Sequence, residues 1–496
     1  MLNRGLDKQE LLRIVDSVAN EKSIDKELIL NSMETAIQRA AYSKFGFENA
    51  IEATINREDG TIKIQKVLEI VENVEDPVRQ ITLQQAGNLD KKNKNLKVGD
   101  KIYEELPQID FGRIAAQSAK QVISQKVREA EKNRQYEDFK DKKVAVIGTG
   151  SSAIQSSPII AADAQTVTIF QRTPNYSIPA RNAALDPSYV DDIKARYSSY
   201  RDENWQRGFG ADFRDNEQSA LSVSNEERLA EYEDRWARGG LAFLAAYSDL
   251  VFDDEANSTA RDFFGEKIAS RVEDPELAQK LIPDFPIGCK RLCVDTDYYE
   301  IYNEEHVTLV DLKEQPIREV TETGIRTSVG DFEADIIVLA TGFDAMTGAV
   351  TRIDIKGRQG RTLEDKWAEG PRAFLGLATE GFPNMFLVTG PGSPSVLSNM
   401  LPSIEQHVEW ISDCIEYLNE NHLSTIDVSI DAENEWVRHV NEVGNTSVYP
   451  RCNSWYLGAN VEGKKRVFMP YLGVPPYVEK CKEVVAAGYE GFVLSA

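Results

Sequence analysis

The sequence has few of the residues that build disulfide scaffolds, metal centres or membrane spans. Its 496 residues include only five Cys and four His, too few for a fold held together by disulfides. Apolar runs such as 336–340 are far shorter than the roughly 20 residues that cross a bilayer. Residues 1–12 have no apolar core of signal-peptide length. We therefore expect a cytoplasmic protein with free thiols and no membrane partner.

Basic residues are also scarce, with 57 Lys and Arg against 81 Asp and Glu and a net charge of -24. A field of this sign repels phosphate, so direct DNA binding is not expected. The deficit is uneven, because residues 1–140 carry a net charge of -1 and the remaining residues carry -23. Every Cys, His and Trp also lies after residue 140. This division predicts a domain boundary near residue 140.

Residues 1–140 are typical of a small α+β module. Two alternating runs, 51–55 and 62–68, flank Asp59-Gly60, a dipeptide suited to a tight hairpin. A further strand is expected near 101–105. No His, Cys or Gly-x-Gly loop occurs in this part of the sequence, so no catalytic constellation is expected here. Apolar residues recur at helical spacing in three stretches, which are 11–18, 29–40 (ending at Gly46) and 112–127.

Two segments of this module carry a family resemblance, ELLRIVDSVANEKSIDKELILNSMETAIQRAAYSKFG (10–46) and IDFGRIAAQSAKQVI (109–123). They resemble the N-terminal domain of the bacterial transcription factor NusA. The resemblance implies a domain that docks on RNA polymerase and acts in pausing, termination and antitermination. Four lysines, Lys91, Lys92, Lys94 and Lys97, are interpreted as a solvated loop, with an RNA contact as the alternative.

A dinucleotide-binding motif begins shortly after residue 140. The apolar strand 144–147 runs into Gly148-x-Gly150-x-x-Ala153, and a helix follows. The first Gly permits a tight turn, the second admits a pyrophosphate, and the small Ala lets the helix pack closely on the strand. The helix N-terminus offers unpaired N–H groups to phosphates. The residues of this loop expected to bind the cofactor are Gly148, Thr149, Gly150, Ser151, Ser152 and Gln155.

The end of the next strand indicates which nucleotide binds. After 166–170, where an NAD site would place Asp or Glu, the chain has Gln171-Arg172-Thr173. A guanidinium offers paired donors to a 2′-phosphate, whereas a carboxylate would repel it. NADP(H) is therefore favoured over NAD(H), with Arg172 and Thr173 as contacts. The alternative is an Arg that only caps the end of the strand.

A longer series of motifs follows, which is FQRTPNYSIPARN (170–182), CKRLCVDTDYYEIYN (289–303), ADIIVLATGFDAMTGA (334–349), GFPNMFLVTGPGSPSVLSNML (381–401) and SWYLGANVEGKKRVFM (454–469). Over about residues 138–496 the sequence resembles the flavin-dependent Baeyer–Villiger monooxygenases of the phenylacetone and cyclohexanone monooxygenase group. The resemblance implies an α/β Rossmann-like NADP-binding domain at 141–344, with a helical insertion at about 183–285. Residues 345–496 would be the C-terminal part of the FAD and substrate domain, an incomplete FAD-domain segment.

In that family NADPH reduces FAD, and the flavin peroxide converts a small ketone into an ester or lactone. Arg291 matches the family's Arg that stabilises the developing negative charge. Lys290 matches a Lys at the NADP 2′-phosphate. Trp455 matches a Trp beside the cofactor, with core packing as the alternative. The family's substrate loop matches Pro394, Ser395, Val396, Leu397 and Ser398.

One part of the family pattern is not found in the sequence. The family has an FAD-binding fold with its own Gly-rich loop, and the fingerprint F-x-G-x-x-x-H-x-x-x-W, before the NADP loop. Residues 1–140 contain neither, so FAD is expected from the family while its binding by this chain is doubtful. The expected strand 385–389, with Phe386, Leu387 and Val388, would then lack sheet partners. Residues 345–496 are accordingly expected to be less well ordered or aggregation-prone.

Three interpretations follow. The chain is a monooxygenase that retains NADPH binding but is impaired in flavin chemistry, an RNA polymerase-binding module, or a nonfunctional chimera. Cys289 and Cys293 are interpreted as buried thiols rather than metal ligands. His407, in a helical stretch, is interpreted as an ordinary packed or surface side chain.

Overall fold

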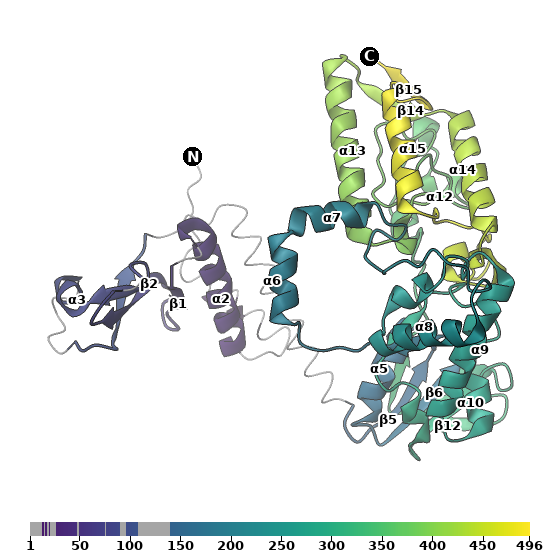
Figure 1. Cartoon of the computed structure of the whole chain (residues 1–496), viewed down its shortest axis with the longest axis horizontal. Helices are drawn as coiled ribbons and strands as arrows, with labels where there is room; N and C mark the ends of the chain where they lie inside the picture. Colours follow the sequence, from purple (N-terminus) through teal and green to yellow (C-terminus); the bar gives the residue numbers. More distant parts are fainter. Residues whose placement is uncertain are drawn as a thin grey trace. The chain divides into compact units, whose positions relative to one another are not determined.

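The computed structural model forms two compact units, Met1–Lys140 and Asp141–Ala496 (Figure 1). The expected helix from residue 112 lies outside the described residues, as do Lys91, Lys92 and Lys94, whereas Lys97 is exposed. Within the described part of the chain, no helix is long and apolar enough to span a membrane. The structure describes residues 12–13, 15–16, 19, 26–46, 49–74, 76–89, 96–107 and 139–496.

The first unit packs helix α2 on a small sheet. Gly46, at a φ of +98°, follows the end of α2, and Ile29 and Ile37 are buried in a core with Ile51. The predicted hairpin is confirmed, with β1 antiparallel to β2 and Gly60 at a φ of +72° in the turn. The short β3 and α3 were not predicted. The elements are α2 (Lys26–Phe45), β1 (Ile51–Ile55), β2 (Ile62–Val71), β3 (Gln80–Thr82), α3 (Leu83–Leu89) and β4 (Lys101–Glu105).

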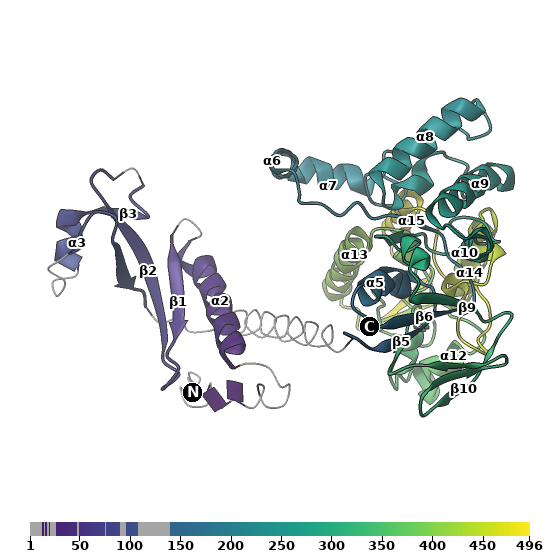
Figure 2. The same cartoon turned by 90° about the horizontal axis from the view of Figure 1, so that it is seen from below.

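The second unit is mixed α/β, as predicted, and begins with a four-stranded parallel sheet in the order β13-β5-β6-β9. Alternate residues of a strand face opposite sides. One face packs with the antiparallel β10–β12 sheet, where Phe170 meets Phe332 edge to face at 5.5 Å. Figure 2 shows helix α5 on the other side. The elements are β5 (Lys143–Ile147), α5 (Ser151–Ala161), β6 (Thr166–Gln171), β9 (Val307–Asp311), β10 (Ile317–Thr321), β11 (Gly324–Thr327), β12 (Asp331–Glu333) and β13 (Ile336–Leu339).

A helical segment lies between two short strands, β7 (Ser177–Pro179) and β8 (Cys293–Asp295), which pair in parallel. Its core is aromatic, since Tyr232, Phe243 and Phe264 are fully buried together. The segment therefore returns to its starting point, which places Arg291 just before β8. Its helices are α6 (Pro187–Ala195), α7 (Tyr197–Trp205), α8 (Asn225–Arg238), α9 (Asp254–Arg271) and α10 (Pro275–Leu281).

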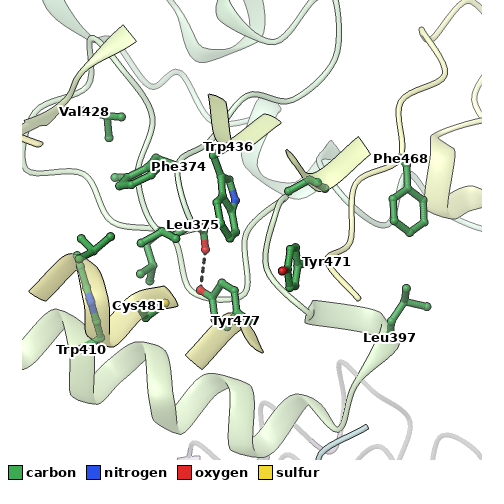
Figure 3. Packing of buried hydrophobic residues seen from close by; sticks show 14 of the residues in the cluster. Phe374, Leu375, Leu397, Trp410, Val428, Trp436, Phe468, Tyr471, Tyr477 and Cys481 are labelled. Atoms are coloured by element: carbon green, nitrogen blue, oxygen red, sulfur yellow. Dashed lines mark hydrogen bonds between the residues drawn. The ribbon is translucent and has the colours of Figure 1, made fainter. Parts of the chain in front are cut away.

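The C-terminal part of the second unit has its own large core, in which Trp436 stacks on Tyr471 with ring centroids 5.3 Å apart (Figure 3). The phenol of Tyr477 donates to the carbonyl of Leu375 at 2.6 Å. Helix α13 packs against α15, and Figure 1 places α14, β14 and β15 in the same region. The elements are α11 (Gly348–Thr351), α12 (Leu363–Lys366), α13 (Met400–Glu420), β14 (Thr425–Val428), α14 (Ile430–Asn445), α15 (Val474–Ala486) and β15 (Phe492–Ser495).

The segment 385–389 corrects an expectation, because it forms no strand and yet its backbone finds partners. The Leu387 N–H donates to the carbonyl of Leu377 at 2.7 Å, and the Thr389 N–H donates to Nδ1 of His407 at 2.8 Å. Leu387 is buried, whereas Val388 is exposed. The expected unpaired strand is therefore wrong: a loop and helix α13 satisfy these donors in place of a sheet. Aggregation of this region stays a prediction.

Candidate dinucleotide-binding site

The turn between β5 and α5 requires glycine at its first position. Gly148 has a φ of +118°, and a Cβ built there would lie 2.3 Å from the carbonyl oxygen of Ala340. Any other residue would clash with this backbone oxygen, which follows β13. The sequence signal and the geometry agree here: the chain turns tightly at the carboxyl end of β5, between two neighbouring strands.

The N-terminus of α5 is open to a ligand. Gly150, the N-cap, makes no side-chain cap, and the first turn has no acidic residue. A Cβ at Gly150 would meet nothing within 4 Å, so there is space beside the free N–H groups. Ser151, Ser152 and Gln155 are exposed around this end, and Gln155 donates to Ser151 Oγ at 3.2 Å. Uncapped N–H groups and the helix dipole favour an anion at this point.

Thr149 and Thr173, both expected to contact the cofactor, are hydrogen-bonded to each other in the structure. The side chain of Thr149 is buried, and its Oγ1 donates to the carbonyl of Thr173 at 2.7 Å. That bond ties the glycine turn to the residues after β6. Ala153 is fully buried, as expected for a helix packed closely on its strand. The Thr149 hydroxyl is therefore a brace for the turn, which leaves its backbone N–H as the group that can face a phosphate.

Two cations lie at the carboxyl edge of the sheet. Arg172, directly after β6, is exposed, and no hydrogen bond or ion pair joins it to another described residue. Lys290 is half-buried, with Nζ 4.6 Å from the ring centroid of Phe285. Burial, together with the nearby positive charge of Arg172, lowers the pKa of Lys290 to about 8. The structure thus brings together the two cations assigned to the 2′-phosphate, and their repulsion would be relieved by an anion.

Arg291 follows Lys290 in the sequence and is exposed. Burial raises the pKa of Cys293 to about 12, and the charge of Arg291 opposes that rise. The same charge acts on Tyr456, whose ring centroid lies 4.3 Å from that of Trp455. Trp455 is half-buried and packs on the C-terminal core. Arg291 and Trp455 are therefore brought into one neighbourhood, and Trp455 contributes to the core as well.

The cysteines require a correction. Cys289 is buried, but it is not a free thiol, because it forms a disulfide with Cys452. Cys293 is a free, buried thiol as predicted, and it accepts from Nδ2 of Asn175 at 3.1 Å. Its raised pKa keeps it protonated, so it is no nucleophile at neutral pH. In the part of the chain that is described, no cluster of three or more His, Cys, Asp or Glu could hold a metal ion.

The matched substrate loop is folded into the protein. Pro394, Ser395 and Leu397 are buried, and Ser398 contacts Ser403 of α13 through their hydroxyls at 2.9 Å. A short 3₁₀ helix, Ser395–Leu397, sets this shape. Val396 is half-buried and packs against the C-terminal core. The sequence did not indicate an open cavity of about 490 Å³, whose walls include Asn441, Asn445, Arg451, Cys452 and Arg466.

The site fits one dinucleotide. Gly208 and Gly210 follow α7, and Gly390 and Gly392 lie in a loop before a 3₁₀ helix. Neither pair joins a parallel strand to an α-helix, so among the described residues only the turn at Gly148 forms a cradle of this type. The residues fit NADP(H), and they provide no second cradle for the pyrophosphate of FAD.

Comparison with known proteins supports both resemblances drawn from the sequence. A family model described as the NusA N-terminal domain matches residues 10–133. Cyclopentanone 1,2-monooxygenase from Comamonas sp. (strain NCIMB 9872) is 39% identical over 360 residues, which cover 72% of this chain and 66% of the relative. Acetone monooxygenase (methyl acetate-forming) from Gordonia sp. (strain TY-5) is 39% identical over 365 residues, covering 72% and 68%.

A solved structure gives the same result. Cyclohexanone monooxygenase from Rhodococcus sp. Phi1, bound to NADP+, is 40% identical, with a TM-score of 0.70, over 72% of this chain and 68% of that chain. The chain spans about two thirds of the length of the curated relatives it matches. With this identity and coverage, the chain belongs to the Baeyer–Villiger monooxygenase family.

Proposed function

We propose that the second unit binds NADPH and carries the nucleotide-binding part of a monooxygenase site for converting a small ketone to an ester or lactone, with the flavin chemistry of that reaction impaired in this chain. The observation that carries this proposal is the pair of cations, Arg172 and Lys290, at the edge of the sheet beside the uncapped N-terminus of α5. The turn at Gly148 and the N-terminus of α5 bind the pyrophosphate, and the two cations bind the 2′-phosphate that distinguishes NADPH from NADH.

The residues of the chain have separate parts in this proposal. The backbone N–H groups at Gly150 and Ser151 hold the pyrophosphate, and Arg172 with Lys290 holds the 2′-phosphate. Arg291 supplies a fixed positive charge near Trp455, where negative charge developing on a substrate would be stabilised. The bound nucleotide supplies the reducing equivalents. The ketone class is proposed because the relatives are named for cyclopentanone, acetone and cyclohexanone.

Titration of the purified chain with NADPH tests the nucleotide assignment. We expect saturable binding, and loss of roughly tenfold or more in affinity for Arg172→Asp, because a carboxylate replaces a phosphate contact. The affinity for NADH should change little. If Arg172→Asp binds NADPH as the unsubstituted chain does, the assignment of the site is wrong.

The visible spectrum tests the flavin. Because the described residues form one cradle, we expect the purified chain to lack a flavin spectrum and not to consume NADPH with cyclohexanone. A yellow protein that holds FAD and oxidises NADPH with a ketone would show that flavin binds elsewhere in the chain, and it would overturn the expected impairment.

A second function is favoured for the first unit by its own core and by its match to the NusA N-terminal domain. The proposed partner is RNA polymerase. Capture of purified core polymerase by the immobilised full chain tests this proposal, with a Baeyer–Villiger monooxygenase that lacks a NusA-like unit as control. Equal retention of polymerase on the two immobilised proteins would reject it.

A further inference from the structure

A third cation reaches the nucleotide edge of the sheet from β9. Strands β6 and β9 run in parallel, with Gln171 opposite Asp311. The N–H of Leu312 donates to the carbonyl of Gln171 at 2.8 Å, so the chain after β9 leaves the sheet beside the residues after β6. Lys313 therefore emerges at the same edge as Arg172.

Lys313 also faces the segment that carries Lys290. Its Nζ lies 3.8 Å from Oδ2 of Asp284, and the next residue, Phe285, supports Nζ of Lys290 at 4.6 Å. Burial and Arg172 lower the pKa of Lys290, the Asp284 carboxylate opposes this, and Lys313 lowers it again. Arg172, Lys290 and Lys313 thus share this edge of the site with the Asp284 carboxylate. Asp311, which accepts from the N–H of Lys313 at 2.8 Å, and Glu314, which pairs with Lys280, lie on either side of Lys313.

We propose that Lys313 is a further determinant of NADPH specificity, because it adds positive charge beside the 2′-phosphate subsite and neutralises the Asp284 carboxylate. The inference rests on the proposed binding of NADPH at Arg172 and Lys290. A carboxylate at this edge is the group that favours NADH in related folds, because it repels a 2′-phosphate and accepts from ribose hydroxyls. In the Asp284–Lys313 pair, the positive charge of Lys313 offsets the negative charge of such a carboxylate, which reduces its repulsion of a 2′-phosphate.

Calorimetric titration of the full chain with NADP+ and, separately, with NAD+ tests the proposal without any flavin. Lys313→Ala should weaken NADP+ binding by roughly three- to tenfold at low salt and leave NAD+ binding within about twofold, as charge effects at exposed sites are modest and salt-dependent. The loss should shrink as the salt concentration rises.

Two variants separate the role of Lys313 from a general loss of positive charge. Lys480→Ala is the matched control, because Lys480 is exposed on α15 and pairs with Glu483 at 3.0 Å, on an element that carries none of the three cations. It should leave both affinities unchanged. Asp284→Asn added to Lys313→Ala should restore most of the lost NADP+ affinity, because the unmasked carboxylate is removed.

The outcomes distinguish this inference from the proposed function. If Lys313→Ala behaves like Lys480→Ala while Arg172→Ala weakens NADP+ binding, the role of Lys313 is overturned and the NADPH site stands. If Asp284→Asn restores no affinity, the neutralising role is overturned. If Arg172→Ala also leaves NADP+ binding unchanged, the proposed site itself is wrong.

Discussion

Cys289 and Cys452, 163 positions apart in sequence, are joined by a disulfide with their Cα atoms 6.0 Å apart. Cys289 immediately precedes Lys290, and Cys452 lies three residues before Trp455. The bond therefore ties the cations of the nucleotide site to the loop that carries the aromatic pair Trp455 and Tyr456. Cys452 also lines the cavity of about 490 Å³, so one side of the bond faces an open space.

We expect the purified chain, unfolded without reductant, to show three free thiols, because two of its five cysteines are bonded. Reduction with a dithiol should raise this number to five and lower the free energy of unfolding by about 2–4 kcal/mol, the range for such crosslinks. Thiol titration and chemical denaturation measure both. In Cys452→Ser the reductant should have no further effect on stability. Five thiols without reductant would show that the bond does not form.

The two glycines of the nucleotide turn should respond differently to alanine. Gly148→Ala places a Cβ against the Ala340 carbonyl at a positive φ, so we expect it to destabilise the unit by about 2–4 kcal/mol. Gly150→Ala has open space and a φ of -89°. It should fold with nearly unchanged stability but bind NADPH at least several-fold more weakly, because the methyl group occupies the approach to the helix.

Thermal unfolding and NADPH titration of both variants make this comparison. Equal losses of stability in the two variants would contradict the role assigned to the open space at Gly150. Unchanged NADPH affinity in Gly150→Ala would contradict the position of the pyrophosphate.

NADPH binding should depend on the protonation of Lys290. Burial, with the charge of Arg172, lowers the pKa of this side chain to about 8, and a bound phosphate favours its charged form. We therefore expect affinity for NADP+ to fall roughly three- to tenfold as the pH rises from 7 to 9.5, with NAD+ binding nearly constant. Lys290→Arg is the control, because arginine stays charged over this range. An equal fall in that variant would assign the pH dependence to another group.

Local patterns predicted the elements that depend on neighbours in sequence. The glycine turn at Gly148, the hairpin at Gly60 and the end of α2 at Gly46 each depend on a backbone conformation that short motifs encode. The positions of Arg172 and Lys290 could also be predicted, because motif spacing and family resemblance both indicated them.

Features that join distant segments could not be read from the sequence. Five cysteines do not determine a pairing, so Cys289 is interpreted from the sequence as a buried thiol, whereas it is bonded to Cys452. The pairing of Lys313 with Asp284 depends on β9 lying beside β6. Residues 385–389 are expected to need a sheet because the resembling family has a sheet strand there, whereas a helix and a loop supply the partners.

One of those partners, His407, forms a buried chain of hydrogen bonds. Its Nδ1 accepts from the Thr389 N–H, so the proton sits on Nε2, which donates to the Tyr477 hydroxyl at 2.8 Å. Tyr477 in turn donates to the carbonyl of Leu375 (Figure 3). This series of hydrogen bonds joins α13, α15 and the loop at 385–389. It requires neutral histidine, since a protonated Nδ1 would no longer accept from Thr389.

Stability should therefore fall in mild acid through His407. Burial lowers its pKa from 6.5 to about 4, so between these values the unfolded chain takes up a proton that the folded chain does not. The full contribution is present above pH 6.5 and is lost progressively down to pH 4, amounting to roughly 3 kcal/mol. Denaturation of the chain and of His407→Asn across this range isolates the effect from that of the carboxylates. Asn keeps an acceptor for Thr389 but does not titrate, so its stability should fall less steeply; parallel curves would show that His407 is not the group responsible.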